Sequence, residues 1–145
     1  MIIKLTPEQI ADYWSMIKHG VVIANRLRVD KVEETTNKLL ERLLIGKAQC
    51  WLGYNIKNGE REFSAFGLTT IEESSIGEVY LFLHTLYGFR LISPELLEEI
   101  VPKLEVFAHD SGCSKMVTLT ANKRLQEYYT SQGFAQDPMV FVKEL

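Results

Sequence analysis

Two adjacent tyrosines near the end of a helical stretch are the first candidates for chemistry in this sequence. The stretch RLQEYYTSQGF, residues 124–134, is typical of the last turns of a helix that stops at Gly133. Neighbouring side chains on a helix point about 100° apart, so Tyr128 and Tyr129 cannot both face one surface. One ring can pack into the core while the other faces a site. The alternative, that both rings only pack the helix onto a sheet, stays open.

Two groups that can accept a proton occur in the apolar stretch GEVYLFLHTLYG. If this stretch is a strand, alternation places four side chains on one face: Glu78, Tyr80, Phe82 and His84. An imidazole titrates near neutral pH, and a carboxylate is ionised there, so both His84 and Glu78 are candidate general bases. The structural alternatives are a solvated strand end for Glu78 and a hydrogen-bonded core histidine for His84.

The elements that position these residues begin with a short apolar run, MIIKL, which predicts an edge strand. Thr6-Pro7 then marks the start of a helix. Asp30 and Glu33 predict the capping box of a second helix, which ends at Gly46. The spacing of apolar residues changes from helical to strand-like in AQCWLGYNI and EFSAFGLTTI. These stretches predict two strands joined by a hairpin turn at Asn58-Gly59.

The stretch that holds Glu78 and His84 is apolar at nearly every position, which predicts a strand buried on both faces. Ser93-Pro94 opens another helix, which stops at Gly112. Pro102 lies inside it and predicts a kink or a division into two helices. The remaining chain predicts a strand over KMVTLT, a helix over NKRLQEYYTSQGF and a last strand over MVFVKEL, residues 139–145.

The predicted order is β-α-α-β-β-β-α-β-α-β. Antiparallel hairpins come first, and the later strand–helix–strand crossover requires parallel neighbours. We therefore expect one α+β domain over residues 1–145, with a mixed central sheet between layers of helices (α/β/α).

Composition narrows the function classes. The 145 residues are 46% hydrophobic and 24% charged, with a formal net charge of −3. Lys and Arg are scattered, which argues against nucleic acid as a partner, and no apolar run approaches the length of a membrane span. The three histidines and two cysteines fit no metal spacing. We expect a cytoplasmic protein that binds no metal and is a monomer or a homodimer.

The element order and the C-terminal third resemble the GNAT superfamily of acetyl-CoA-dependent N-acetyltransferases. Members often carry Asn, a small residue, an aromatic-Tyr pair and Gly-Phe across the helix after the fifth strand. The residues that match this spacing are Asn122, Tyr128, Tyr129, Gly133 and Phe134, whereas Leu125 stands where Ala is usual. The short GNAT-like proteins of phages and prophages are the most similar members.

The resemblance implies roles for particular residues. Tyr129 would point at the sulfur of acetyl-CoA and give the leaving thiolate a proton, while Tyr128 would pack toward the sheet. Glu78, or alternatively His84, would take a proton from an unknown amine acceptor. The cofactor would contact residues of the fourth strand, the following loop and the last helix: Leu83, Thr85, Leu86, Gly88, Phe89, Arg90, Leu91, Ser93 and Asn122.

The loop after the fourth strand departs from the family. Its usual form, Gln/Arg-x-x-Gly-x-Gly/Ala, surrounds the diphosphate with backbone N–H groups. In LYGFRLISPELL, Leu91 and Ser93 stand where the small residues belong, and Gly88 and Arg90 are out of register. Two hypotheses follow. Either the loop still binds coenzyme A through Gly88, Ser93 and Arg90, or the chain is a non-catalytic GNAT-like protein, such as a phage component that binds a protein partner.

Overall fold

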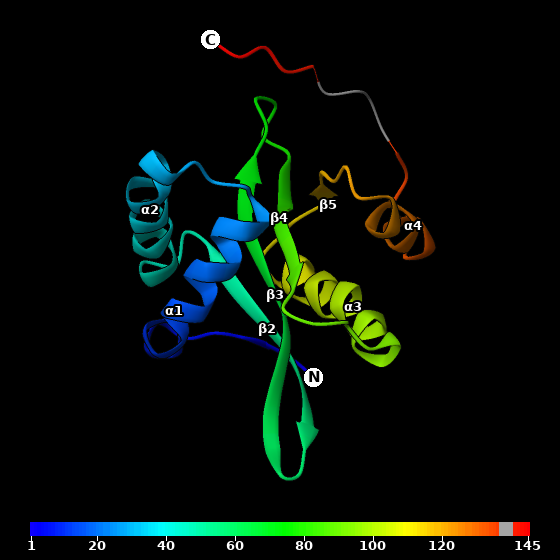
Figure 1. Ribbon diagram of the computed structural model, residues 1–145. Helices are drawn as coiled ribbons and strands as arrows, with labels where there is room; N and C mark the ends of the chain where they lie inside the picture. The colour runs from blue at the N-terminus through cyan, green and yellow to red at the C-terminus, as the bar shows by residue number, and fades with distance from the viewer. Residues whose placement is uncertain (137–140) are drawn as a thin grey trace.

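The five strands of the computed structural model, which describes residues 1–136 and 141–145, form a mixed sheet in the order β1-β2-β3-β4-β5 (Figure 1). Their bounds are Ile2–Lys4, Gln49–Lys57, Glu60–Glu73, Val79–Gly88 and Lys115–Thr118. The pairs β1–β2, β2–β3 and β3–β4 are antiparallel, and β4–β5 is parallel. The predicted mixed sheet and the parallel crossover are confirmed.

The helices cover both faces of the sheet, as expected (Figure 1). Helices α1 (Pro7–Ala24) and α2 (Val32–Leu44) pack on one face, where their core includes Ile10, Ile17, Leu43, Leu52 and Phe66. Helices α3 (Pro94–Asp110) and α4 (Lys123–Ser131) pack on the other, with Leu81, Leu83, Leu96, Ile100 and Tyr129. Each of these large side chains contributes roughly 1.5–3 kcal/mol through burial. The three-layer α+β fold predicted from the sequence is confirmed.

Side-chain caps begin three of the four helices. Thr6 and Gln9 form a reciprocal capping box at α1, Ser93 accepts a hydrogen bond from the Leu96 N–H at α3, and Asn122 caps α4. The capping box predicted for Asp30 was wrong.

At that position a short 3₁₀ turn, Val29–Lys31, precedes α2, whose N-cap Lys31 makes no side-chain cap. Both residues that we expected in the capping box form ion pairs instead. Asp30 pairs with Arg28 at 3.2 Å, and Glu33 pairs with Lys18 at 2.8 Å.

Helix α3 runs through Pro102 as one element, so of the two predicted outcomes the division into two helices was wrong, while a kink stays a prediction. Pro102 is exposed, and water can replace the hydrogen bond that its ring removes. Val101 and Leu104 on the buried side are 1% and 2% exposed, so core contacts hold the helix together on both sides of the proline.

Strand β4 is not buried on both faces, which corrects the prediction from its apolar run. Leu81 and Leu83 are buried toward α3, whereas His84 on the opposite face is exposed. The α1–α2 core reaches only the far end of β4, at Tyr87, and Phe89 just after the strand.

The last strand predicted for residues 139–145 falls partly on residues 139 and 140, which lie outside the described residues. Phe141–Leu145 form no strand. Phe141 and Val142 are 90% and 79% exposed, so little burial offsets the entropic cost of ordering them.

Candidate active site at the fork of β4 and β5

Strands β4 and β5 separate halfway along β4, and this fork is the candidate site. Their parallel pairing runs from Tyr80↔Lys115 to Leu83↔Thr118, where β5 ends, while β4 continues to Gly88. Within the described residues, the outer edge of β4 after Leu83 therefore has no neighbouring strand. Such an edge presents backbone donors and acceptors that an extended ligand can bind.

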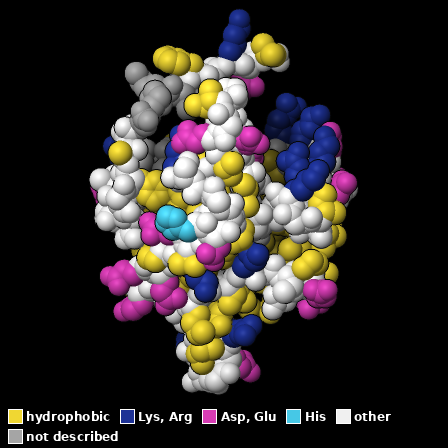
Figure 2. All heavy atoms as spheres, turned by 180° about the vertical axis from the view of Figure 1, so that it is seen from behind, with side chains coloured by type: hydrophobic (Ala, Val, Ile, Leu, Met, Phe, Trp, Pro, Cys, Tyr) yellow, Lys and Arg dark blue, Asp and Glu magenta, His cyan; other side chains and the backbone are white. Residues whose placement is uncertain are grey.

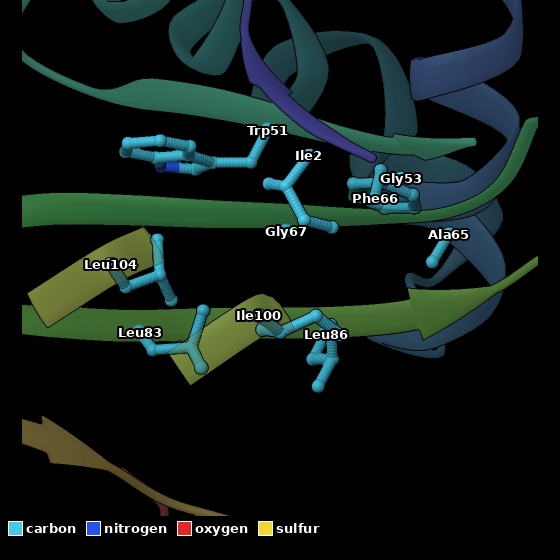
Figure 3. Close-up of a pocket in the computed structure, with 10 residues that line it drawn as sticks. All are labelled: Ile2, Trp51, Gly53, Ala65, Phe66, Gly67, Leu83, Leu86, Ile100 and Leu104. Carbon is cyan, nitrogen blue, oxygen red and sulfur yellow. The ribbon is translucent and has the colours of Figure 1, made fainter. Parts of the chain in front are cut away.

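A β-bulge in β4 lies at the fork. Leu68 pairs with Thr85 and Thr69 with Leu83, so His84 is the extra residue on β4. A bulge changes the direction in which neighbouring side chains point. Leu83 and Leu86, three residues apart, consequently both face the core beneath α3 (Figure 3), whereas His84 lies on the other face.

Tyr129 lies at the base of the fork. The Thr118 hydroxyl donates a hydrogen bond to the Leu83 carbonyl oxygen at 3.0 Å, across the last β4–β5 pair. Tyr129 is only 5% exposed; burial raises the pKa of its phenol, and hydrogen bonding with the Thr118 side chain opposes this rise. The phenol is therefore protonated at neutral pH, as a proton donor must be.

Tyr128 points away from the fork. Its hydroxyl donates a 2.6 Å hydrogen bond to the carbonyl oxygen of Leu97 in α3, and burial raises its pKa to about 12. The ring packs against the core between the sheet and α3–α4, where we expected it, and its hydroxyl in addition ties α4 to α3. The two tyrosines do point in different directions, as their helical spacing requires.

His84 lies beside the fork on the face opposite Tyr129. Its Nε2 is 2.6 Å from Thr70 Oγ1, and its ring centroid is 4.3 Å from that of Phe82. Although His84 reaches solvent, its partial burial is the largest influence and lowers its pKa; the Glu72 carboxylate opposes this effect and Arg42 adds to it. A lowered pKa leaves the ring neutral at pH 7, and a neutral imidazole can accept a proton.

Glu78 lies at the other end of β4. Its carboxylate accepts a hydrogen bond from the Ser114 hydroxyl at 3.2 Å and pairs with the Lys115 ammonium at 3.3 Å. His84 follows Glu78 by six positions, which span roughly 20 Å of extended chain. A catalytic role for Glu78 stays a prediction, and of the two candidate bases His84 is the one at the fork.

The loop between β4 and α3 is held by its own contacts. The Phe89 N–H donates to the Ser64 carbonyl at 2.7 Å, and a Cβ on Gly88 would lie 2.8 Å from the Arg90 carbonyl oxygen, so this tight path requires glycine. Arg90 pairs with Glu62 at 3.1 Å, and Leu91 is 83% exposed. The guanidinium of Arg90 is thus already paired with the carboxylate of Glu62.

The start of α3 offers few free donors. Pro94 has no N–H, and the Leu96 N–H bonds to the Ser93 hydroxyl at 3.2 Å. Glu95 adds a negative charge to the first turn, where an anion would otherwise be favoured. Ser93 is therefore a helix cap, and its predicted contact with a cofactor stays untested.

The other predicted cofactor residues also have structural roles. Asn122 Oδ1 accepts hydrogen bonds from the backbone N–H groups of Arg124 and Leu125, and Leu125 packs against the core around Tyr129. Thr85 is buried on β4. Whether these residues also contact a cofactor stays a prediction.

The cavity in Figure 3 is too small for a cofactor. It holds about 20 Å³, roughly the space of one water, between α3 and the sheet. Gly53 and Gly67 line it, together with larger side chains that include Trp51, Leu104 and Ile100. The free edge of β4, rather than this cavity, is the part of the site that can accept an extended ligand.

Surface charge is mixed. In the rear view of Figure 2, Lys and Arg side chains gather on the side that α2 occupies in Figure 1. Around α2, Lys31 and Lys38 both pair with Glu34, at 3.7 and 3.1 Å, which partly neutralises them. The described residues contain no cluster of acidic, His and Cys side chains fit for a metal, and no described helix is long and apolar enough to cross a membrane.

Three polar residues were not identified from the sequence: Thr118 at the fork, and Thr70 and Glu72, which are hydrogen-bonded in a chain with His84. They form no motif, and their position follows from strand register and from the bulge at His84. Alternation alone would have placed Thr70 and Glu72 on one face of β3, but not beside His84.

Comparison with protein-family models and with curated proteins found no match. Comparison with solved structures found the same fold in several proteins. A "probable acetyltransferase" superposes with a TM-score of 0.74 at 17% identity, covering 100% of this chain and 96% of the other. A predicted acetyltransferase from Clostridium acetobutylicum, solved with acetyl-CoA, gives 0.72 at 15% identity, with 100% and 95% covered.

The aminoglycoside N-acetyltransferase AAC(6')-Iy, solved in complex with CoA, gives a TM-score of 0.70 at 12% identity, with 99% and 93% covered. These likenesses establish the GNAT-like fold of this chain.

Proposed function

We propose that this protein is an acetyl-CoA-dependent N-acetyltransferase that acts on a primary amine. The proposal rests on the fork of β4 and β5, where Tyr129 lies in the core on one face of the sheet and His84 contacts Thr70 on the other. The acetyl-CoA and CoA complexes of proteins with this fold support it.

The residues at the fork suit the two proton transfers of amide formation. Acetyl-CoA would supply an acetyl thioester. His84 accepts the proton that the neutral amine loses as the new C–N bond forms. Tyr129 donates its proton to the sulfur as the C–S bond breaks. General acid and base catalysis of this kind contributes about 10²- to 10⁴-fold each.

The residues around the fork suit the pantetheine arm of coenzyme A better than they suit its diphosphate. The free edge of β4 from His84 to Gly88 can bind the extended pantetheine arm through backbone groups. The diphosphate would meet a loop whose Arg90 is paired with Glu62 and a helix start that Pro94 deprives of one donor. We therefore propose binding that is weaker than a glycine-rich loop would give.

The second candidate, a non-catalytic GNAT-like protein that binds a protein partner, rests on that same loop. It predicts that neither coenzyme A nor acetyl-CoA binds. A phage-type origin, a cytoplasmic location and a homodimer stay predictions.

The test is release of free thiol from acetyl-CoA in the presence of a panel of amines. The parent protein should release coenzyme A with at least one amine. Tyr129→Phe should reduce turnover by about 10²- to 10⁴-fold while cofactor affinity is retained, because only the hydroxyl is lost. Tyr128→Phe is the matched control and should turn over at the parent rate. Equal turnover by Tyr129→Phe and the parent would remove Tyr129 from the mechanism.

A further inference from the structure

Three polar side chains form a hydrogen-bonded chain on the face of the sheet that carries His84. Thr70 and Glu72 alternate along β3, so both share a face with Leu68 of the α1–α2 core. The Thr70 hydroxyl oxygen is 2.6 Å from His84 Nε2 and 2.8 Å from the Glu72 carboxylate oxygen Oε1. Both distances are those of strong hydrogen bonds.

The number of protons fixes the direction of this chain. A threonine hydroxyl has one proton to donate, and an ionised carboxylate can only accept. The Thr70 hydroxyl donates to Glu72, so toward His84 its oxygen acts only as an acceptor. His84 must therefore carry its proton on Nε2. In the neutral ring, Nδ1 then holds the free lone pair.

Charged groups from two elements face His84. Glu72 on β3 raises its pKa, and Arg42 on α2 lowers it together with burial. The Phe82 ring packs beside it on β4. When Nδ1 gains a proton, Nε2–H still donates to Thr70, and the carboxylate of Glu72 stabilises the positive charge through the shared hydroxyl.

We propose that Thr70 and Glu72 are positioning residues that hold His84 in the Nε2–H form and leave Nδ1 as the atom that accepts the proton of the amine. The part assigned to Nδ1 in catalysis rests on the proposed N-acetyltransferase function. The acceptor amine would then reach the fork from the face of the sheet on which α1 and α2 pack, opposite Tyr129, at the part of that face where His84 is exposed.

The tautomer can be tested without any substrate, by ¹⁵N–¹H correlation of the histidine rings in the full chain. His84→Gln assigns the His84 signals against those of His19 and His109. The neutral ring should show a protonated Nε2 and an unprotonated Nδ1. A protonated Nδ1, or a tautomer mixture like that of a free imidazole, would overturn the proposal.

Substitutions separate positioning from simple packing. Thr70→Val removes the hydroxyl and should give a tautomer mixture, whereas Thr70→Ser should keep the parent tautomer. Glu72→Gln keeps an oxygen that can accept from Thr70 but removes the charge, so the pKa of His84 should fall. Glu73→Gln, an exposed neighbour whose side chain points to the other face, is the matched control and should leave that pKa unchanged.

If an acceptor is found, the acid limb of the profile of kcat/KM against pH should move to lower pH in Glu72→Gln and stay in place in Glu73→Gln. Thr70→Val should lower kcat/KM by at least about 10-fold, within the range that a general base contributes. A Thr70→Val variant with the parent tautomer and the parent kcat/KM would overturn the positioning role. The expected tautomer in a protein that transfers acetyl to no amine would instead overturn the proposed function.

Discussion

The ion pair between Arg90 and Glu62 decides how much positive charge the β4–α3 loop can offer to a diphosphate. The two side chains are 3.1 Å apart and both reach solvent, with exposed fractions of 53% and 34%. A ligand that uses Arg90 must first break this pair, which for exposed groups costs about 0.2–1 kcal/mol.

Releasing Arg90 should therefore tighten binding of coenzyme A. Glu62→Gln is expected to lower the dissociation constant by up to about 5-fold at low salt, and Arg90→Ala to raise it. Isothermal titration measures both. Glu60→Gln at the exposed hairpin is the control. Equal affinities of the parent, Glu62→Gln and Arg90→Ala would exclude Arg90 from the site.

The hydroxyl of Tyr128 belongs to the fold rather than to the reaction. Tyr128→Phe removes its hydrogen bond to Leu97 and should lower the free energy of unfolding by about 1 kcal/mol, without a change in turnover. Urea unfolding monitored by fluorescence measures the free energy of unfolding, and thiol release measures turnover. A loss of turnover in a fully folded Tyr128→Phe would contradict this assignment.

The pKa of Tyr128 adds a pH dependence. Because burial raises it to about 12, ionisation opposes folding; the contribution to stability is present below pH about 10 and is lost as the pH rises toward 12. The parent protein should therefore lose more stability than Tyr128→Phe between pH 8 and 11. Parallel losses in the two proteins would argue that Tyr128 is not the group that titrates.

Residue spacing predicted part of the site. The separation of Tyr128 from Tyr129 follows from helix geometry, and the shared face of Phe82 and His84 follows from strand alternation. The contact between Thr70 and His84 depends on which residues of β3 and β4 pair. No local pattern in one strand contains that information.

At the scale of elements, α3 shows how core packing overrides a local preference. Pro102 disfavours a helix, yet the buried residues on either side keep α3 in one piece. The caps at Thr6 and Ser93 were predicted from the sequence because each is a local arrangement, whereas Asn122 was noted only as a match to the family motif. The start of α2 was not predicted correctly, because Asp30 and Glu33 form ion pairs with residues outside the helix.

Replacing the proline should stabilise α3. Pro102→Ala restores a backbone hydrogen bond at an exposed helical position and is expected to raise the free energy of unfolding by up to about 3 kcal/mol. Lys103→Ala, at the neighbouring exposed position, should change it by less than about 0.5 kcal/mol. Urea unfolding of the two variants measures both changes in the free energy of unfolding. A Pro102→Ala variant that is less stable than the parent would contradict an uninterrupted α3.

At the scale of the whole molecule, the fold buries both cysteines. Cys50 and Cys113 are free thiols with exposed fractions of 0% and 8%, and burial raises the pKa of Cys50 to about 12 and also that of Cys113. Neither forms a reactive thiolate at neutral pH.

The native protein should therefore react slowly with a thiol reagent such as Ellman's reagent, and two thiols should react rapidly after unfolding in urea. This also makes thiol release from acetyl-CoA measurable against a low background. Rapid labelling of the native protein would contradict the burial of at least one cysteine.

The layered fold explains how the proposed site combines residues from both faces of the sheet. A mixed sheet with helices on both faces could be predicted from the sequence, since hydrophobic period and caps are local signals, but a sixth strand was also predicted over residues 139–145, and residues 141–145 form none. The fork could not be predicted, because it depends on how far β5 follows β4. The proposed reaction joins the two faces there, with the proton donor Tyr129 on the α3–α4 side and the proton acceptor His84 on the α1–α2 side.

The most direct test of this claim is a titration of the ¹⁵N-labelled protein with coenzyme A, followed through its backbone amide signals. We expect saturable shifts at the free edge of β4, at Thr85, Leu86 and Gly88, and at Thr118 where β5 ends. The amides of the β2–β3 turn, Asn58 and Gly59, should not move. Unchanged spectra at millimolar coenzyme A, or shifts confined to residues away from the fork, would contradict it.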